Sequence, residues 1–451
     1  MEDLEARQRG RLARWPTTTD EPVFKSWARL LARTAILLAA LIGLGIVAVG
    51  VGELIPDRWV AAHLVDARQD GTLTNTAQEK TRVGGIADHF TECVSISVGL
   101  GHGSDSFLES MAGSPNLGPC DRLVAAVDEF SQTDRLPEGG RYLRYWHGTS
   151  SIFRIVIAVG GLAVLRVLAF AAVVGSVLLV ARQVRQVAGV PAAVAIVGPF
   201  VATTDFIVLS GTVHHSMTLA VAFAGAALVA TAAFRTGGVW FSAVLAGAAF
   251  VYVDLLTNVP GAWALVTAMA IFAARTRTAD PAVVARTGIA AGVGWIVGYA
   301  GMWAGKWAFA ASVLGYDVVR SDVTDSVRER VNGDSPWSED RFGAAIDANV
   351  DAWFEIPFTR VVLLLSVLVL AKAIWSRLRN RTVRSDSIAG VLIAIVPALL
   401  PFVWFEFASN HSQVHAWFTY RSIPLALGIG MLALLTPEPK PRRAAESAPV
   451  A

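Results

Sequence analysis

Charged residues are scarce in this sequence of 451 residues. Aspartate, glutamate, lysine and arginine together make up 16% of the chain, whereas soluble domains carry about 25%. Apolar residues reach 54%, and the mean hydropathy is +0.51. This composition excludes an ordinary soluble enzyme and predicts an integral membrane protein. The net charge of only +2 gives no overall excess that would attract nucleic acid.

Cysteine is nearly absent as well. The only two, Cys93 and Cys120, fall in the same hydrophilic stretch. The charge pattern described below places that stretch outside the cytoplasm, where disulfides persist. We therefore predict a disulfide between Cys93 and Cys120. Two free thiols are the alternative, and no neighbouring residues identify either cysteine as a nucleophile.

Several familiar motifs are missing. No small-residue cleavage site closes the first apolar run, so we expect that run to remain in the protein as a membrane span. The glycine-rich GLGHG at residues 99–103 is not part of a Walker A or dinucleotide-binding motif, so it supports a phosphate loop only weakly. His411 and His415, in HSQVH, lack the glutamate of HExxH, so we do not expect zinc-protease chemistry.

Apolar runs of the length needed to span a bilayer, about 20 residues, recur between residues 34 and 435. They predict an all-α polytopic membrane protein with about ten transmembrane helices. The run 152–181 is long and contains Arg154 and Arg166, which suggests a short interfacial helix followed by a span, and the run 260–274 is short. The ten runs lie near residues 34–55, 152–181, 189–210, 214–234, 239–257, 260–274, 288–312, 357–375, 387–408 and 419–435.

The arginines set the expected orientation, because short cytoplasmic connections are enriched in lysine and arginine. Residues 1–33 are basic. If the chain has ten spans, the short connections on the same side of the membrane as residues 1–33 contain arginine. The short connections on the other side, near 211–213 and 258–260, contain neither lysine nor arginine. We therefore expect both termini in the cytoplasm, including a disordered tail at 436–451. Two long polar loops would lie outside, at about 56–150 and about 313–356.

One connection, residues 404–421, concentrates polar side chains between two apolar runs. Its sequence is WFEFASNHSQVHAWFTYR. His411 and His415 share a face if this stretch is helical, and Arg421 opens the next apolar run, where an ionisable residue is by default a functional candidate. Interfacial anchoring is the alternative, since tryptophan and tyrosine favour that depth. The candidate binding residues here are Asn410, His411, His415, Tyr420 and Arg421.

Other polar residues fall at the same predicted rim. Asp88 and Glu92 are four residues apart and are the candidate catalytic acids, because a general base must lie near the acceptor hydroxyl. A divalent cation held by these acids and a histidine is a further hypothesis. Solvated loop acids, aromatic anchors and snorkelling cations are the structural alternatives. The remaining candidate binding residues are Arg144, Trp146, His147, His214, His215, Asp254, Asn258 and Lys306.

This layout resembles the GT-C superfamily of glycosyltransferases that use polyprenyl-phosphate sugars. One span, a large acidic outer loop and many further spans with arginine and histidine at the outer rim carry the resemblance. The composition, rich in Ala, Val and Arg, is similar to that of actinobacterial arabinofuranosyl- and mannosyltransferases. The motifs YWHG at 145–148 and NHSQVHAWFTYR at 410–421 look like those of an uncharacterised branch of bacterial membrane proteins. The resemblance covers the whole chain as architecture.

The resemblance implies an enzyme of the bacterial plasma membrane with its active site facing outside. Such an enzyme moves a sugar from a polyprenyl-phosphate donor to an extracytoplasmic glycan or glycoconjugate, with inversion. No cofactor is certain for it. Its base is an acidic residue of the first outer loop. Glu53 and Asp57 lie closest to the first span, while Asp88 and Glu92 sit in the richer motif, so all four stay open.

The family also holds the donor phosphate with Arg, Lys or His near the membrane face, and Arg421, His415 and Lys306 are the matching residue types. A transporter or flippase for a lipid-linked or small substrate is the alternative function. It predicts internal repeats and polar groups deep in several spans, and no repeat is visible in the sequence. A non-sugar transferase or a structural protein of envelope assembly is the third hypothesis.

Labelling in intact cells tests the orientation. A cysteine introduced at Asn332, in the second polar loop, should react with a membrane-impermeant maleimide before lysis, because that loop is expected outside. A cysteine introduced at Arg379, in a connection expected in the cytoplasm, is the matched control and should react only after lysis. The reverse pattern at the two positions would invert the topology.

Overall fold

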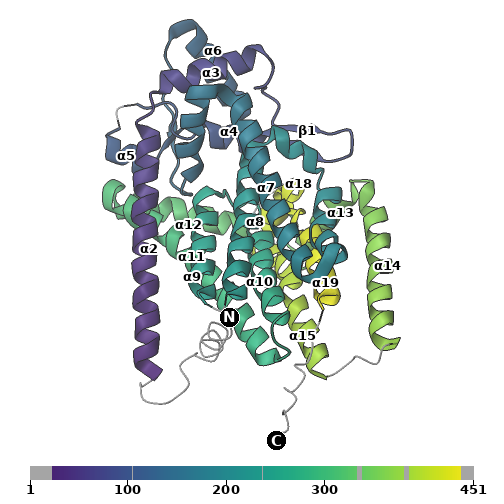
Figure 1. Ribbon diagram of the computed structural model, residues 1–451. Helices are drawn as coiled ribbons and strands as arrows, with labels where there is room; N and C mark the ends of the chain where they lie inside the picture. The colour runs from purple at the N-terminus through teal and green to yellow at the C-terminus, as the bar shows by residue number, and fades with distance from the viewer. Residues whose placement is uncertain (1–22, 104, 236, 333–337, 380–384, 438–451) are drawn as a thin grey trace, which may run out of the picture.

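The computed structural model describes residues 23–103, 105–235, 237–332, 338–379 and 385–437 (Figure 1). Most of these residues are helical, and the strands form two small two-stranded sheets. The predicted all-α membrane class is confirmed. Most of the predicted basic segment and nearly all of the predicted disordered tail lie outside the described residues.

Seven helical stretches among the described residues are long and apolar enough to cross a membrane, and two shorter apolar helices accompany them. The elements concerned are α2 (Val23–Glu53), α7 (Gly148–Thr203), α8 (Val213–Phe234), α9 (Val239–Val253), α10 (Val259–Arg275), α11 (Pro281–Leu314), α14 (Phe358–Arg379), α15 (Ser385–Ile395) with η2 (Val396–Leu399) and α16 (Leu400–Phe407), and α18 (Ala416–Thr419) with α19 (Ser422–Leu435).

The number of long stretches differs from the ten predicted runs for two physical reasons. The runs at 239–257 and 260–274 form the short helices α9 and α10. The runs at 152–181 and 189–210 both belong to α7, which is broken at Gly161 and Gly189, where φ is +79° and +82°. Only glycine adopts such angles readily, so each break ends one straight piece and starts another. Ten membrane crossings stay a prediction.

Both polar segments lie at one end of the helical body, which we call the polar end, while α2 begins at the opposite end (Figure 1). The first segment pairs the hairpin β1–β2 antiparallel, with Gln78 opposite Asp88, and β3 with β4. Its elements are α3 (Asp57–Gln69), β1 (Gln78–Lys80), β2 (Ile86–Asp88), α4 (His89–Ser97), α5 (Phe107–Ala112), β3 (Pro115–Asn116), α6 (Cys120–Thr133) and β4 (Gly140–Arg141). The second segment contains α12 (Tyr316–Asn332) and α13 (Ala344–Phe354).

Close helix packing in the apolar body depends on small residues. A Cβ atom added at Gly247 of α9 would lie 2.0 Å from the carbonyl oxygen of Trp295, and one at Gly298 of α11 would lie 2.0 Å from that of Val244. The two helices therefore pack backbone against backbone, as small residues allow in membranes. This contact anchors α11, whose far end carries Lys306 at the polar end.

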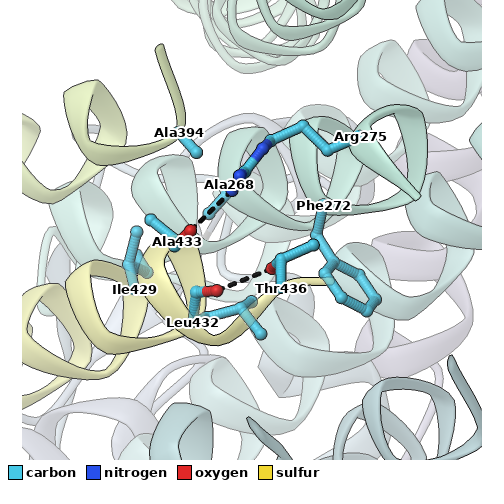
Figure 2. Close-up of a pocket in the computed structure, with 8 residues that line it drawn as sticks. All are labelled: Ala268, Phe272, Arg275, Ala394, Ile429, Leu432, Ala433 and Thr436. Atoms are coloured by element: carbon cyan, nitrogen blue, oxygen red, sulfur yellow. Dashed lines mark hydrogen bonds between the residues drawn. The ribbon is translucent and has the colours of Figure 1, made fainter. Parts of the chain in front are cut away.

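A small space lies toward the opposite end, between α10, α15 and α19 (Figure 2). Arg275 crosses it and donates from Nη1 to the carbonyl oxygen of Ala433 at 2.6 Å. The other lining residues are mostly apolar, so we interpret the space as a packing void around an arginine that is already hydrogen-bonded. They are Ala268, Phe272, Ala394, Ile429, Leu432 and Thr436.

The predicted disulfide is present. Cys93 of α4 and Cys120 at the start of α6 are joined with a Cα–Cα distance of 5.0 Å, and both are buried in the apolar core of the first polar segment. The bond ties α4, which follows directly after Asp88, to α6. It therefore fixes the position of α4, the helix that Asp88 caps.

Peptide mapping under non-reducing conditions tests this bond. The purified protein should give one peptide pair linked through Cys93 and Cys120. The double variant Cys93→Ser with Cys120→Ser should lose roughly 3 kcal/mol of stability in the chain-entropy account of a loop of this size, measured by thermal unfolding in detergent. Two cysteines that alkylate freely after unfolding without reductant would contradict the bond.

Candidate functional site

The connection at residues 404–421 folds as a chain of short helical pieces. After α16, α17 covers Ser409–Val414 and α18 covers Ala416–Thr419, with breaks at Ala408 and His415. The rings of His411 and His415 lie 4.6 Å apart, so the two histidines face the same side as their spacing predicted. The ring of Phe418 then stacks on His415 at 5.2 Å.

The second polar segment covers this connection. Asn349 of α13 donates to the carbonyl oxygen of Ser412 at 2.9 Å and accepts from the Thr419 hydroxyl at 2.6 Å. Gln413 and the backbone of Glu339 exchange hydrogen bonds in both directions, at 2.8 and 3.1 Å. These bonds fix the histidines under α12 and α13 rather than leaving them on a solvated turn.

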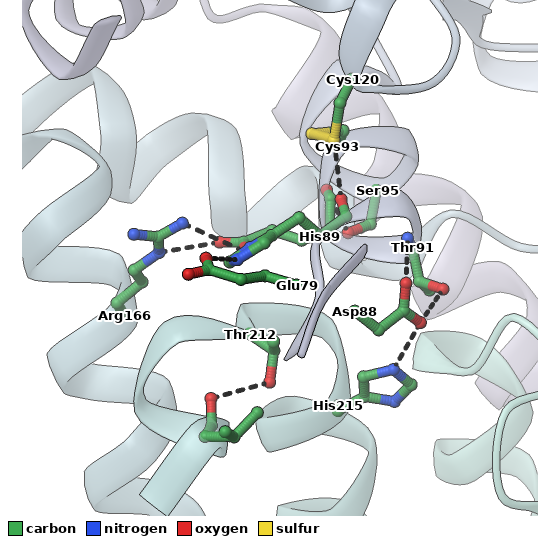
Figure 3. Close-up of polar contacts among 12 residues, drawn as sticks. Glu79, Asp88, His89, Thr91, Cys93, Ser95, Cys120, Arg166, Thr212 and His215 are labelled. Carbon is green, nitrogen blue, oxygen red and sulfur yellow. Dashed lines mark hydrogen bonds and ion pairs between the residues drawn. A yellow bond between two sulfur atoms is a disulfide. The ribbon is translucent and has the colours of Figure 1, made fainter. Parts of the chain in front are cut away.

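Asp88, the last residue of β2, reaches the same place from the first polar segment. Its carboxylate is fully buried; it accepts from His215 Nε2 at 2.8 Å and from the Thr91 hydroxyl at 2.5 Å (Figure 3). Burial alone would raise the pKa of Asp88, but the bonds from His215 and Thr91 outweigh it and hold that pKa well below its usual range. Asp88 is therefore an ionised carboxylate paired with one histidine. The ring of His215 also packs on the ring of Phe418, with 5.2 Å between the ring centres.

Glu92, the second predicted acid, is engaged elsewhere. Arg166 of α7 donates to its carboxylate from Nε at 2.9 Å and Nη2 at 3.2 Å, and His89 lies 3.3 Å from it. Arg166 and His215 lie on opposite sides of the β2–α4 junction in Figure 3. A buried carboxylate held in two bonds by an arginine serves best as a structural tie between α4 and α7.

Arg421 is the cation of this region. Its side chain is 2% exposed, and its Nε and Nη1 atoms are buried with no hydrogen-bond partner among the described residues. It acts electrostatically on His215 and lies beside the hydroxyl of Tyr420. No ion pair joins it to a carboxylate within the described ranges. A buried arginine in this state is expensive unless an anion completes it.

Further candidates meet at the same point from α9 and α10. Ser422 donates to Asn258 Oδ1 at 2.7 Å, and His411 Nε2 donates to the carbonyl oxygen of Leu256 at 2.9 Å. Asp254 caps the loop between them by accepting from Thr257. Several predicted site residues keep buried polar atoms without partners in the described part of the chain. They are His147, His214, Asn258, Asn410, His415, Tyr420 and Arg421.

Other predicted residues belong to the packing around this point. Lys306 Nζ binds the carbonyl oxygens of Ala112, at 2.5 Å, and Met111, at 3.4 Å, at the end of α5. Trp146 Nε1 donates to the carbonyl oxygen of Met302 at 2.6 Å. Arg144 lies 3.9 Å from Asp322 of α12 and is half exposed. Lys306 thus caps a helix and does not join Arg421.

A second polar cluster lies where α2 ends and α3 begins. His102 is placed between two carboxylates, with Nε2 2.6 Å from Glu53 and Nδ1 3.0 Å from Asp57. Arg154 of α7 donates to Asp57 at 2.9 Å, and Ser114 donates to Glu53 at 2.9 Å. His102 lies in the GLGHG stretch and was not among the predicted site residues. The sequence did contain one sign of this cluster, because two acids, Glu53 and Asp57, lie close to the end of the first span.

This cluster has a defined charge state. Burial alone would lower the pKa of His102, but its bonds to Asp57 and Glu53 raise that pKa to about 9. Burial would likewise raise the pKa of Asp57, but His102 and Arg154 lower it to about 2. The imidazolium and the carboxylate therefore coexist at neutral pH and join α2 to α3.

Neither cluster forms a metal centre in the part of the chain that the structure describes, where no group of three or more His, Cys, Asp or Glu side chains is placed to hold a metal ion. The hypothesis of a cation between Asp88, Glu92 and a histidine does not fit this geometry, because the two carboxylates bind different partners.

Comparisons with protein-family models, curated proteins and solved structures return no match for this chain.

The His102 cluster makes stability depend on pH. A histidine whose folded pKa is about 9 contributes fully below its ordinary pKa of 6.5 and loses that contribution as pH rises through 9. The melting temperature in detergent should therefore fall between pH 7 and 10. His102→Gln should remove this component, whereas His63→Gln, at a half-exposed site on α3, should keep it. Equal pH profiles for His102→Gln and the unaltered protein would refute the assignment.

Proposed function

We propose that this protein is an integral-membrane glycosyltransferase that moves a sugar from a polyprenyl-phosphate donor to a glycan or glycoconjugate acceptor on the outer side of a bacterial plasma membrane. The observation that carries the proposal is Arg421, a buried arginine just before an apolar helix, whose Nε and Nη1 have no hydrogen-bond partner within the described part of the chain. A helix N-terminus adds positive potential to that of the guanidinium. The site therefore favours an anion.

The depth of Arg421 selects the kind of anion. Arg421 immediately precedes Ser422, where the apolar helix α19 begins, so it lies where a span meets the polar end. A phosphate attached to a long isoprenoid tail is held at that level by its tail. An arginine at the rim can then contact the phosphate through its planar fork while the tail stays in the bilayer.

The base in this proposal is the pair formed by Asp88 and His215. Asp88 accepts a hydrogen bond from His215 Nε2, which orients the ring and stabilises the imidazolium that forms when the ring takes a proton. Arg421 acts electrostatically on His215, whose ring packs on Phe418, three residues before Arg421 in the chain. The acceptor hydroxyl would lose its proton to the pair and attack the anomeric carbon with inversion. The Glu53–His102–Asp57 cluster is the alternative location for the base.

Substitution of Asp88 tests the base. Asp88→Asn should reduce transfer about 10²–10⁴-fold, the usual contribution of general base catalysis, while donor binding persists, because Asp88 does not hold the phosphate. Transfer is measured with a set of polyprenyl-phosphate sugars, and binding is measured in parallel on folded protein. Asp351→Asn, on an exposed position of α13, is the matched control and should keep full activity. Full activity of Asp88→Asn would move the base to the Glu53 cluster.

Substitution of Arg421 tests the anion site. Arg421→Ala should weaken donor binding and slow the transfer step together, because the same guanidinium holds the phosphate before and during departure. Arg421→Lys should recover only part of the loss, since a point charge cannot reproduce two parallel hydrogen bonds. Unchanged donor affinity in a folded Arg421→Ala variant would leave Arg421 as an anchor residue. It would also withdraw the main support for the function.

A further inference from the structure

Phe342 is the most exposed large apolar side chain among the described residues. It is 87% exposed, although it belongs to the second polar segment and follows three charged residues in the sequence. Single exposed apolar residues are common on protein surfaces and need no explanation. Phe342 differs from these because of the elements that it borders.

The backbone around Phe342 is held against the polar end of α16. Gly343 donates from its backbone nitrogen to the carboxylate of Glu406 at 3.0 Å. Its φ of +89° is an angle that glycine adopts readily, so the chain turns there and α13 begins at the next residue. Gln413 and the backbone of Glu339 exchange hydrogen bonds at the other end of this loop. The loop at residues 339–343 is therefore fixed beside the point where α16 ends.

An exposed apolar stripe reaches the same point along α15, η2 and α16. Its members recur every three or four residues, as one face of a helical span requires, and they are Ile388, Leu392, Val396, Leu399, Val403 and Phe407. This stretch is long and apolar enough to cross a membrane, so its exposed face is suited to lipid. Phe407, at the polar end of the stripe, is 63% exposed. Because Gly343 is bonded to Glu406, Phe342 lies beside the polar end of this stripe.

The other end of α13 also borders a candidate span. α13 ends at Phe354, and α14 begins at Phe358; both phenylalanines are exposed. α14 is long and apolar enough to cross a membrane, and it lies at the edge of the helical body with its start near α13 (Figure 1). α13 has 11 residues, which cover about 16 Å at a rise of 1.5 Å each. It therefore bridges the polar ends of two spans.

The two faces of α13 fit a position along the membrane surface. Asn349 is buried on the inner face, where it bonds to the connection at residues 404–421. Asp347 and Asp351 are exposed on the outer face. Arg341, next to Phe342, donates to Asp347 at 2.8 Å, which ties the loop to α13. Acids toward water and exposed phenylalanines at both ends are expected of a helix that lies in a membrane interface.

We propose that the loop at residues 339–343 dips into the lipid bilayer at the polar end, with the ring of Phe342 among the lipid chains and the acids of α13 in water. The occupant of this surface is lipid, because the surface continues the lipid-facing stripe of α16 and borders the start of α14. Interfacial segments place their apolar side chains about 5–10 Å into the boundary between head groups and chains. The contact requires neither transferase activity nor a particular orientation of the chain in the membrane.

This contact has a consequence for the candidate site. α13 covers the connection that carries His411 and His415, through the bonds of Asn349 to Ser412 and Thr419. A lipid-embedded Phe342 holds the first residues of α13 at a fixed depth. The bilayer therefore helps to keep the cover over the two histidines in place.

A fluorescent label at position 342 tests the lipid contact. Cys93 and Cys120 are joined to each other and the chain has no other cysteine, so Phe342→Cys offers one reactive thiol in the full-length protein. It is labelled with the environment-sensitive dye NBD in lipid nanodiscs that hold one copy each. Quenching by lipids with a nitroxide near the top of the acyl chain should be about 3-fold stronger than at Asp351→Cys, because of the depth expected for an interfacial side chain. Quenching by aqueous iodide should be weaker.

Two controls bracket this measurement. Asp351→Cys, on the outer face of α13, should respond to iodide and barely to the lipid quencher. Leu365→Cys, at an exposed position in the middle of α14, should respond to the lipid quencher and not to iodide. A label at 342 that behaves like the one at 351 would overturn the lipid contact and leave this surface for a protein partner or a second copy.

Hydrogen exchange tests the contact without a label. In the same nanodiscs, the backbone amides of α13 should exchange about 10-fold faster in Phe342→Ser than in the unaltered protein, because local opening becomes easier. Phe342→Trp keeps a ring suited to the interface and should match the unaltered protein. Amides of α11 serve as the internal control, and melting temperatures within about 3 °C of each other confirm that the variants are folded. Equal exchange of α13 in Phe342→Ser and the unaltered protein would remove the role of lipid in holding α13.

Discussion

The arrangement of the polar end depends on the cost of burying Arg421, which has no carboxylate partner in the described ranges. A guanidinium in a weakly polar environment requires either a carboxylate or hydrogen bonds for all of its nitrogens. Asp88 binds His215 and Glu92 binds Arg166, so neither of these acids pairs with Arg421. The protein thus keeps its acids and this arginine apart. Such a separation retains positive potential at one point, which a structural ion pair would have cancelled.

The other polar cluster follows the opposite principle. Glu53, His102, Asp57 and Arg154 satisfy one another within a few ångströms, so their charges largely cancel. Their arrangement ties the first span to α3 and α7, and it explains why acids can stand so near a membrane boundary. A self-satisfied cluster suits a structural joint, whereas an unsatisfied one suits a ligand. This contrast, more than the identity of the residues, favours the Arg421 region as the functional site.

The sequence allowed part of this to be predicted. Hydropathy revealed the membrane class and most helices, because burial in lipid demands long apolar runs. Two cysteines in one polar segment predicted the disulfide. The clustering of His411, His415 and Arg421 was visible because their separation is local. In contrast, the pairing of Glu92 with Arg166 joins residues that are far apart in the chain, and no local pattern encodes it. The number of spans also stayed open, since glycine breaks divide α7 without interrupting its apolar sequence.

Completion of the site requires segments from the whole chain. Asp88 comes from the first polar segment, His215 from α8 and Arg421 from the residue before α19. The hydrogen bonds of Asn349 to residues of α17 and α18 connect the second segment to the last helices. Arg421 itself precedes α19, which packs against α7 and α10. The proposed anion site is therefore a property of the assembled bundle, and a ligand bound there would stabilise the fold as a whole by mass action.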